Sequence, residues 1–105
     1  MPPSIDAPID ASLSAGVHAA VAAYATLLDG DTPGDVADLF CPDGVVEIVG
    51  IATFEGRDAI RAGYAGWAPV RPQLHLVGNT VITASTADSA GATSDLAFFQ
   101  RGERG

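Results

Sequence analysis

The sequence contains no lysine, and its five arginines face thirteen acidic residues, so its formal net charge is −8. Binding to nucleic acid or to an anionic membrane surface needs a concentration of positive charge, and this composition argues against both partners. No apolar run reaches the roughly 20 residues of a membrane-spanning helix. Residues 1–10 also lack the basic and apolar segments of a secretory signal. The single cysteine, Cys41, excludes an internal disulfide and favours a reducing, cytoplasmic compartment.

Several motifs of catalysis are missing as well. Two distant histidines and one cysteine have no metal-ligand spacing, and the glycines follow no phosphate-binding pattern. No motif marks the nucleophile of a Ser-His-Asp triad. We therefore expect neither a metal nor a cofactor. Cys41, directly before Pro42, is predicted to be a small buried residue rather than a nucleophile.

The charges that are present lie unevenly along the chain. Residues 1–55 hold nine acidic residues and no basic one, whereas residues 56–105 hold four acids and all five arginines. Two interpretations stay open. The acidic half either forms a solvated face, or it complements a basic partner or a neighbouring subunit.

With 105 residues, the chain has the length of one domain. Residues 1–10 contain three prolines and are expected to form a flexible arm, which leaves residues 11–105 as the domain. Apolar residues at helical spacing predict helices over residues 11–28 and 57–66. A shorter helix should run from Pro33 to about residue 40. The apolar residues that carry these predictions are Val17, Val21, Tyr24, Leu28, Val36, Leu39, Phe40, Ile60, Tyr64 and Trp67.

The remaining elements are predicted to be strands. Residues 45–49 and 51–54 form a short hairpin, and the residues from 69 to 72 form a linker. Residues 73–86 and 91–101 form a long hairpin. Early helices and late strands predict an α+β fold in which three helices pack on a curved, mainly antiparallel sheet. A two-stranded hairpin cannot shield three helices, so we expect that a further C-terminal strand is missing or is supplied by another subunit.

Four segments, 24–31, 36–44, 54–61 and 74–79, together resemble the SnoaL-like branch of the nuclear transport factor 2-like superfamily. The third segment reads G-R-D-A-I-R at the start of a helix, and the fourth places His75 four residues before Asn79 on a strand. The resemblance implies a cone-shaped sheet around an apolar pocket that the first three helices close. Phe54, Tyr64 and Trp67 are expected to supply much of the apolar wall, together with Phe98 and Phe99.

The resemblance also implies a site. In relatives that dehydrate or isomerise small ring compounds, an Asp at the end of the first helix and a His on a sheet strand face the pocket. These positions correspond to Asp29 and His75, which would act as orienting carboxylate and general acid/base. Strand parity places Asn79 on the same face as His75 as a polar contact. Tyr24 matches the tyrosine that donates to the oxyanion in ketosteroid isomerases.

The sequence departs from the isomerase pattern at the position of the general base. That position holds Ile48, and strand alternation points the neighbouring Glu47 to the opposite face unless a bulge shifts the register. A second oxyanion donor would lie on a strand beyond this chain. The sequence therefore disfavours a steroid-isomerase mechanism.

Two hypotheses of different classes follow. The first is an enzyme that transfers protons on a small apolar or cyclic molecule without a cofactor, as a lyase, an isomerase or a cyclase. The second is a noncatalytic ligand-binding or dimerisation module of the same fold. An Asp29–His75 pair beside an open cavity favours the enzyme. A homodimer is also expected, through an outer face of the long hairpin that exposes Val81, Ile82 and Leu96.

Overall fold

A computed structural model describes residues 11–67 and 72–100. The predicted arm at residues 1–10 and most of the predicted linker lie outside the described residues. Within these described residues, two α-helices, one 3-10 helix and four strands follow in the order α1 (Ala11–Leu28), η1 (Pro33–Leu39), β1 (Val45–Ile48), β2 (Ala52–Glu55), α2 (Arg57–Ala65), β3 (Gln73–Ser85) and β4 (Ala90–Gln100). The α+β class, with helices packed on antiparallel strands, is confirmed.

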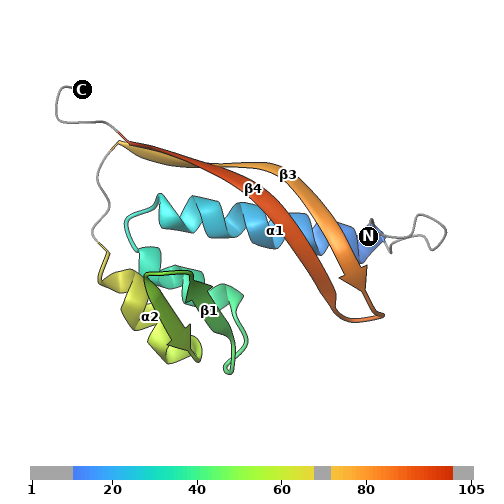
Figure 1. The fold of residues 1–105 in the computed structure, drawn as a ribbon, viewed down its shortest axis with the longest axis horizontal. Helices are drawn as coiled ribbons and strands as arrows, with labels where there is room; N and C mark the ends of the chain where they lie inside the picture. Colours follow the sequence, from blue (N-terminus) through green and yellow to red (C-terminus); the bar gives the residue numbers. More distant parts are fainter. Residues whose placement is uncertain (1–10, 68–71, 101–105) are drawn as a thin grey trace.

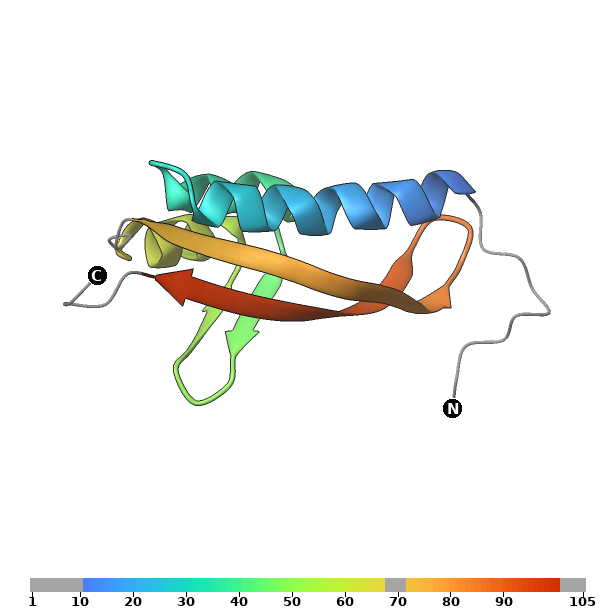
Figure 2. The same ribbon diagram turned by 90° about the horizontal axis from the view of Figure 1, so that it is seen from above.

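The strands form two separate hairpins and not one continuous sheet. β1 pairs with β2, and β3 pairs with β4, in each case antiparallel. Figure 2 shows α1 lying lengthwise along the β3–β4 hairpin, with the β1–β2 hairpin extending away from it. Within the described residues, the long hairpin and α1 form two layers that are open at their edges.

The main core lies at one end of the molecule, where α2 and η1 meet the C-terminal half of α1 (Figure 1). It contains Val36, Ala37, Ile60 and Tyr64, all completely buried. Among the apolar residues that predict the shorter helix, Val36 is therefore buried and Leu39 is not. Leu39 is 40% exposed, because it lines an open cavity at the end of η1.

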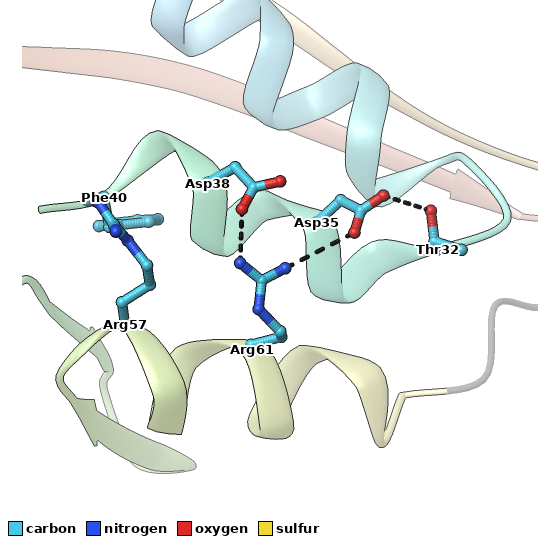
Figure 3. Close-up of polar contacts among 6 residues, drawn as sticks. All are labelled: Thr32, Asp35, Asp38, Phe40, Arg57 and Arg61. Carbon is cyan, nitrogen blue, oxygen red and sulfur yellow. Dashed lines mark hydrogen bonds and ion pairs between the residues drawn. The ribbon is translucent and has the colours of Figure 1, made fainter. Parts of the chain in front are cut away.

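Two arginines of α2 hold η1 and the loop after it in place (Figure 3). Arg61 pairs with Asp38 at 2.5 Å and with Asp35 at 3.7 Å. Arg57 donates from Nε and Nη2 to the carbonyl oxygen of Phe40, at 2.8 and 2.5 Å. Part of the acidic N-terminal half is therefore neutralised within the chain.

Cys41 directly follows Phe40, the residue that Arg57 holds, and it is exposed. The prediction that Cys41 is buried is therefore wrong. The chain leaves η1 at Phe40 in an extended conformation and turns toward β1 at this point. Cys41 therefore lies in the connecting loop and outside the core.

A bulge in β3 changes which residues face α1. The pairing register shifts between Val77 and Thr80, so the alternation of partly buried residues moves from odd to even positions. Ile82 is only 6% exposed, and Leu96 pairs with Val77 on the inner face. The predicted exposure is therefore wrong for Ile82. Leu96 is exposed as predicted, at 50%, but lies on the inner face of the hairpin. Leu74, Leu76, Val81 and Phe99 are the exposed apolar residues of the outer face.

By length and composition alone, α1 is also apolar enough to cross a membrane, contrary to the expectation from its sequence. This is weak evidence for a span, since a helix that packs within a soluble domain passes the same test. One side of α1 contacts β3 and η1, and Ala25 is buried there. Only 11% of the helix is buried, so burial within the described residues does not by itself account for its apolar composition.

Candidate active site

Asp29 and His75 meet where the end of α1 crosses the start of β3. Oδ1 of Asp29 lies 2.6 Å from Nδ1 of His75, and Oδ2 accepts a hydrogen bond of 2.6 Å from the backbone N–H of the same residue. Gln73, two residues earlier on the same face of β3, donates its amide to Oδ1 and to the carbonyl of Leu28, each at 3.2 Å. The carboxylate therefore holds the imidazole and the strand that carries it.

These contacts set the charge and the tautomer of the pair. Burial raises the pKa of the Asp29 carboxyl, but hydrogen bonds from the His75 backbone, the imidazole and the Gln73 amide outweigh this effect and lower it overall. A carboxylate accepts hydrogen bonds only, so Nδ1 of His75 carries the proton. In the neutral form of the ring, Nε2 keeps a lone pair and is the nitrogen left to exchange a proton. The side chains of His75 and Asp29 are 17% and 16% exposed, so the pair is largely shielded from solvent but stays accessible to it.

An apolar cavity of about 370 Å³ lies between α1, the end of η1 and the long hairpin. Val21 and Tyr24 line it from α1, and Val77 and Leu96 line it from the hairpin. His75 and its partner Phe98 form the next inward-facing pair along the two strands, and their rings are 4.6 Å apart. The Cα atom of His75 is therefore about 7 Å along the strand from that of Val77, which lines the cavity.

Tyr24 and Tyr64 are joined through their hydroxyl groups. The two oxygens are 2.7 Å apart, and Tyr24 lines the cavity while Tyr64 is completely buried behind it. Burial raises the pKa of the Tyr64 phenol well above its usual range, and the hydrogen bond to Tyr24 adds to this effect. Tyr64 stays protonated, and its hydroxyl fixes the position of the Tyr24 hydroxyl.

The other predicted aromatic residues of the site gather around Tyr64. Trp67 stacks edge-on against it at 4.9 Å, and Phe54 lies 6.0 Å away between ring centres. Phe54 and Tyr64 thus belong to the core, and Trp67 packs against them while it stays 41% exposed. None of the three is among the residues that line the apolar cavity. Phe99 pairs with Leu74 on the outer face of the hairpin, so its predicted place in the wall is wrong.

Asn79 does not join His75 on one face, as strand parity predicted. The bulge reverses the alternation after Val77, and Asn79 is exposed beside α1 at its N-terminal half, near His18. His18 is exposed. Gln73 was missed in the sequence, although its parity with His75 could have identified it.

Glu47, beside the position that holds the general base in ketosteroid isomerases, points to the opposite face from Ile48, as strand alternation predicted. β1 alternates, with Val46 and Ile48 partly buried and Glu47 exposed on the opposite face. No bulge occurs in the pairing of β1 with β2. Glu47 is therefore directed away from the interior.

The family model for the SnoaL-like domain matches residues 10–105, which is nearly the whole chain. The chain belongs to this family. It lies within the nuclear transport factor 2-like superfamily. A steroid Delta-isomerase from Nocardioides simplex is 33% identical over 84 residues, covering 79% of this chain and 68% of the relative. These matches place the SnoaL-like chain in a family of proton-transfer isomerases and lyases.

Solved structures agree on the fold. A candidate aromatic ring hydroxylase from Novosphingobium aromaticivorans superposes with a TM-score of 0.81 at 22% identity, covering 93% of this chain and 71% of the other. A nuclear transport factor 2-like protein with a cystatin-like fold from the same organism gives a TM-score of 0.59 at 22% identity, covering 90% and 75%. At this identity the likeness shows the SnoaL-like fold alone.

No group of three metal-ligating side chains is assembled within residues 11–67 and 72–100 of the SnoaL-like domain. The Asp29–His75 pair is a hydrogen-bonded dyad and not part of such a group. Its geometry is suited to moving a proton between Nε2 and a bound molecule.

Proposed function

We propose that this SnoaL-like chain is a cofactor-independent enzyme that transfers protons on a small apolar or cyclic molecule, as an isomerase, lyase or cyclase. The observation that carries the proposal is the double contact of Asp29 with the imidazole and the backbone of His75. Such a contact fixes the tautomer and the orientation of the ring, and it stabilises the imidazolium that forms when Nε2 accepts a proton. The apolar cavity one step along the strand offers a site for the substrate.

The roles of the surrounding residues follow from their positions. His75 accepts a proton from the substrate at Nε2 and returns it to another atom of the substrate or to a leaving group. The Tyr24 hydroxyl, held by Tyr64, donates to an oxygen that gains negative charge. Phe98 covers one face of the imidazole and limits access of water. The exposed Cys41 is compatible with the reducing environment of the cytoplasm, which we propose as the location.

The test is proton exchange with solvent. A Δ5-3-ketosteroid and a simple cyclic enone, each incubated in D2O, are followed by NMR for deuterium uptake beside the carbonyl group. We expect His75→Gln to lower the exchange rate by about 10²- to 10⁴-fold, the usual contribution of a positioned acid/base. Asp29→Asn should lower it less, because the imidazole stays in place but loses its fixed tautomer.

Glu47→Gln is the matched control. Glu47 is exposed and faces away from the interior, so its replacement should leave the rate unchanged. Loss of exchange in Glu47→Gln with retention in His75→Gln would overturn the proposal in favour of a carboxylate base on β1. Binding of these compounds with no exchange above background would favour the noncatalytic ligand-binding module.

A further inference from the structure

The G-R-D-A-I-R segment at the start of α2 carries two arginines four residues apart, and therefore on one face of the helix. Figure 3 shows both side chains extending from α2 toward η1 and the residue after it. Neither arginine is among the residues that line the apolar cavity. Their partners differ, because Arg61 pairs with the exposed carboxylates of Asp35 and Asp38, whereas Arg57 binds the backbone.

Arg57 holds the backbone of a residue that lines the cavity. Its Nε and Nη2 atoms both donate to the carbonyl oxygen of Phe40, in a partly buried contact. Its backbone N–H donates to the carbonyl oxygen of Pro42 at 3.0 Å. Among the residues that the structure describes, no carboxylate pairs with Arg57. The guanidinium therefore places two charge-assisted hydrogen bonds on one neutral acceptor, and such bonds are stronger than those between neutral groups.

Phe40 is also held from its other side. Its N–H donates to the carbonyl oxygen of Ala37 at 3.1 Å, where the chain leaves η1 in an extended conformation. Gly44 lies against the ring, since a Cβ added there would be 3.1 Å from Cβ of Phe40 and 3.2 Å from Cδ1. Of these contacts, only that of Arg57 comes from α2. It ties the position of Phe40 to the helix across the core.

The held segment forms one wall of the apolar cavity. Leu39 and Phe40 line the cavity from the end of η1, opposite the residues of α1 and of the long hairpin. Leu39 is 40% exposed, so its own packing fixes it only in part. A shift of the Phe40 backbone would move both side chains. Because an apolar ligand is bound by close contact with such walls, this shift would change its affinity.

We propose that Arg57 is a positioning residue for this cavity, which holds the wall of Leu39 and Phe40 and thereby determines how tightly an apolar ring compound binds. The use of the cavity for a substrate rests on the proposed function. Arg57 then acts on binding, whereas His75 acts on the chemical step.

The probe is 2-naphthol, an uncharged molecule of two fused rings, and calorimetry gives its dissociation constant. We expect Arg57→Met to raise this constant about five- to tenfold, as for the loss of one to two hydrogen bonds. Arg57→Lys should raise it about two- to fivefold, because an ammonium group cannot reproduce the two-donor contact of the guanidinium. Arg61→Met is the matched control and should keep the constant of the parent, since exposed ion pairs contribute little.

Two readouts distinguish positioning from a general effect on stability. The methyl NMR signals of Leu39 should shift in Arg57→Met without any ligand, and should stay in place in Arg61→Met. In the exchange assay with the Δ5-3-ketosteroid, Arg57→Met should raise KM and leave kcat close to that of the parent. His75→Gln should show the reverse.

The outcomes separate this proposal from the proposed function. An unchanged dissociation constant in Arg57→Met and Arg57→Lys, an equal rise in Arg61→Met, or no binding of 2-naphthol to the parent would overturn the role of Arg57. If Arg57→Met does not fold, the comparison of Arg57→Lys with the parent decides. Binding that depends on Arg57, without proton exchange in the parent, would overturn the enzymatic function alone.

Discussion

At the scale of single residues, Asp29 links stability to chemistry. Asp29 directly follows α1, and its carboxylate accepts a hydrogen bond from the backbone of β3 and orients the His75 ring. One group therefore joins two elements through residues that are 46 positions apart in the sequence. The site is therefore built on a contact that also holds the long hairpin to α1. Changes at Asp29 should be visible in the free energy of unfolding as well as in the proposed proton transfer.

We predict that Asp29→Asn lowers the free energy of unfolding at neutral pH by about 1–2 kcal/mol, since it weakens charge-assisted hydrogen bonds. The native pKa of Asp29 is lowered, so its stabilising effect is fully present above the unfolded pKa of about 4. The effect is lost as the pH falls through the lower native value. Urea denaturation of parent and variant from pH 7 to pH 2 should show the difference shrinking below about pH 4. A difference that is constant over this range would contradict the prediction.

The tyrosine pair provides a second residue-scale prediction. Tyr24→Phe leaves the buried Tyr64 hydroxyl without its partner, which should destabilise the fold by about 1–3 kcal/mol. Tyr64→Phe leaves only the half-buried Tyr24 hydroxyl without its partner. This hydroxyl can turn toward water, so we expect a destabilisation of about 1 kcal/mol or less. The double variant should recover part of the loss in Tyr24→Phe. Chemical denaturation of the three variants measures this, and equal losses in the two single variants would argue against the asymmetry.

At the scale of elements, the two α-helices differ in how tightly their glycines are packed. Gly63 of α2 faces the aromatic cluster, and a Cβ there would lie 2.5 Å from Cε1 of Phe54, whose ring is packed against Tyr64 and Trp67. Gly16 of α1 has no atom within 4 Å of an added Cβ. Close packing of α2 on β2 thus requires a glycine, whereas α1 has room for a side chain.

The same substitution in the two helices should therefore have opposite effects. Gly16→Ala should raise the free energy of unfolding by about 0.5–1 kcal/mol, through the higher helix propensity of alanine. Gly63→Ala should lower it by about 1–3 kcal/mol, because the Phe54 ring has to move within a packed cluster. Thermal unfolding of both variants, each followed by circular dichroism, serves as a matched pair. Stabilisation by Gly63→Ala would show that the Phe54 ring yields easily.

At the scale of the whole molecule, the long hairpin has two apolar faces. The inner face packs against α1 and lines the apolar cavity beside Tyr24, and the outer face exposes Leu74, Leu76 and Phe99, each 51–56% accessible. An apolar sheet face of this kind favours association. We propose that the chain forms a homodimer through this outer face.

Sedimentation velocity tests the dimer. The parent is expected to sediment as a dimer at high micromolar concentration, and Leu76→Glu as a folded monomer. Val49→Glu is the matched control, because Val49 is 85% exposed in the turn between β1 and β2, away from the long hairpin. A parent that stays monomeric at high concentration would contradict the proposal.

Much of the fold could be predicted because the patterns that encode it are local. The spacing of Val17, Val21, Tyr24 and Leu28 predicted the bounds of α1. The run of β-branched residues predicted the two strands of the long hairpin, and each described end of these strands lies within one residue of its predicted position. Asp29 and His75 were paired through their resemblance to a family motif, and the structure brings them to 2.6 Å. Their catalytic roles stay predictions.

The sequence by itself determined the order of the elements and the absence of lysine-based contacts, since these depend on residue types and local periodicity. The dyad was identified through the resemblance to a family motif and not from these local patterns. Only the tertiary structure decided that β3 bulges at Gly78 and Asn79, that Gln73 joins the dyad and that Leu39 borders a cavity. Each of these depends on how β3 pairs with β4 or packs against α1. A shift of one residue in pairing moves a side chain to the opposite face and leaves no trace in the local pattern of the sequence.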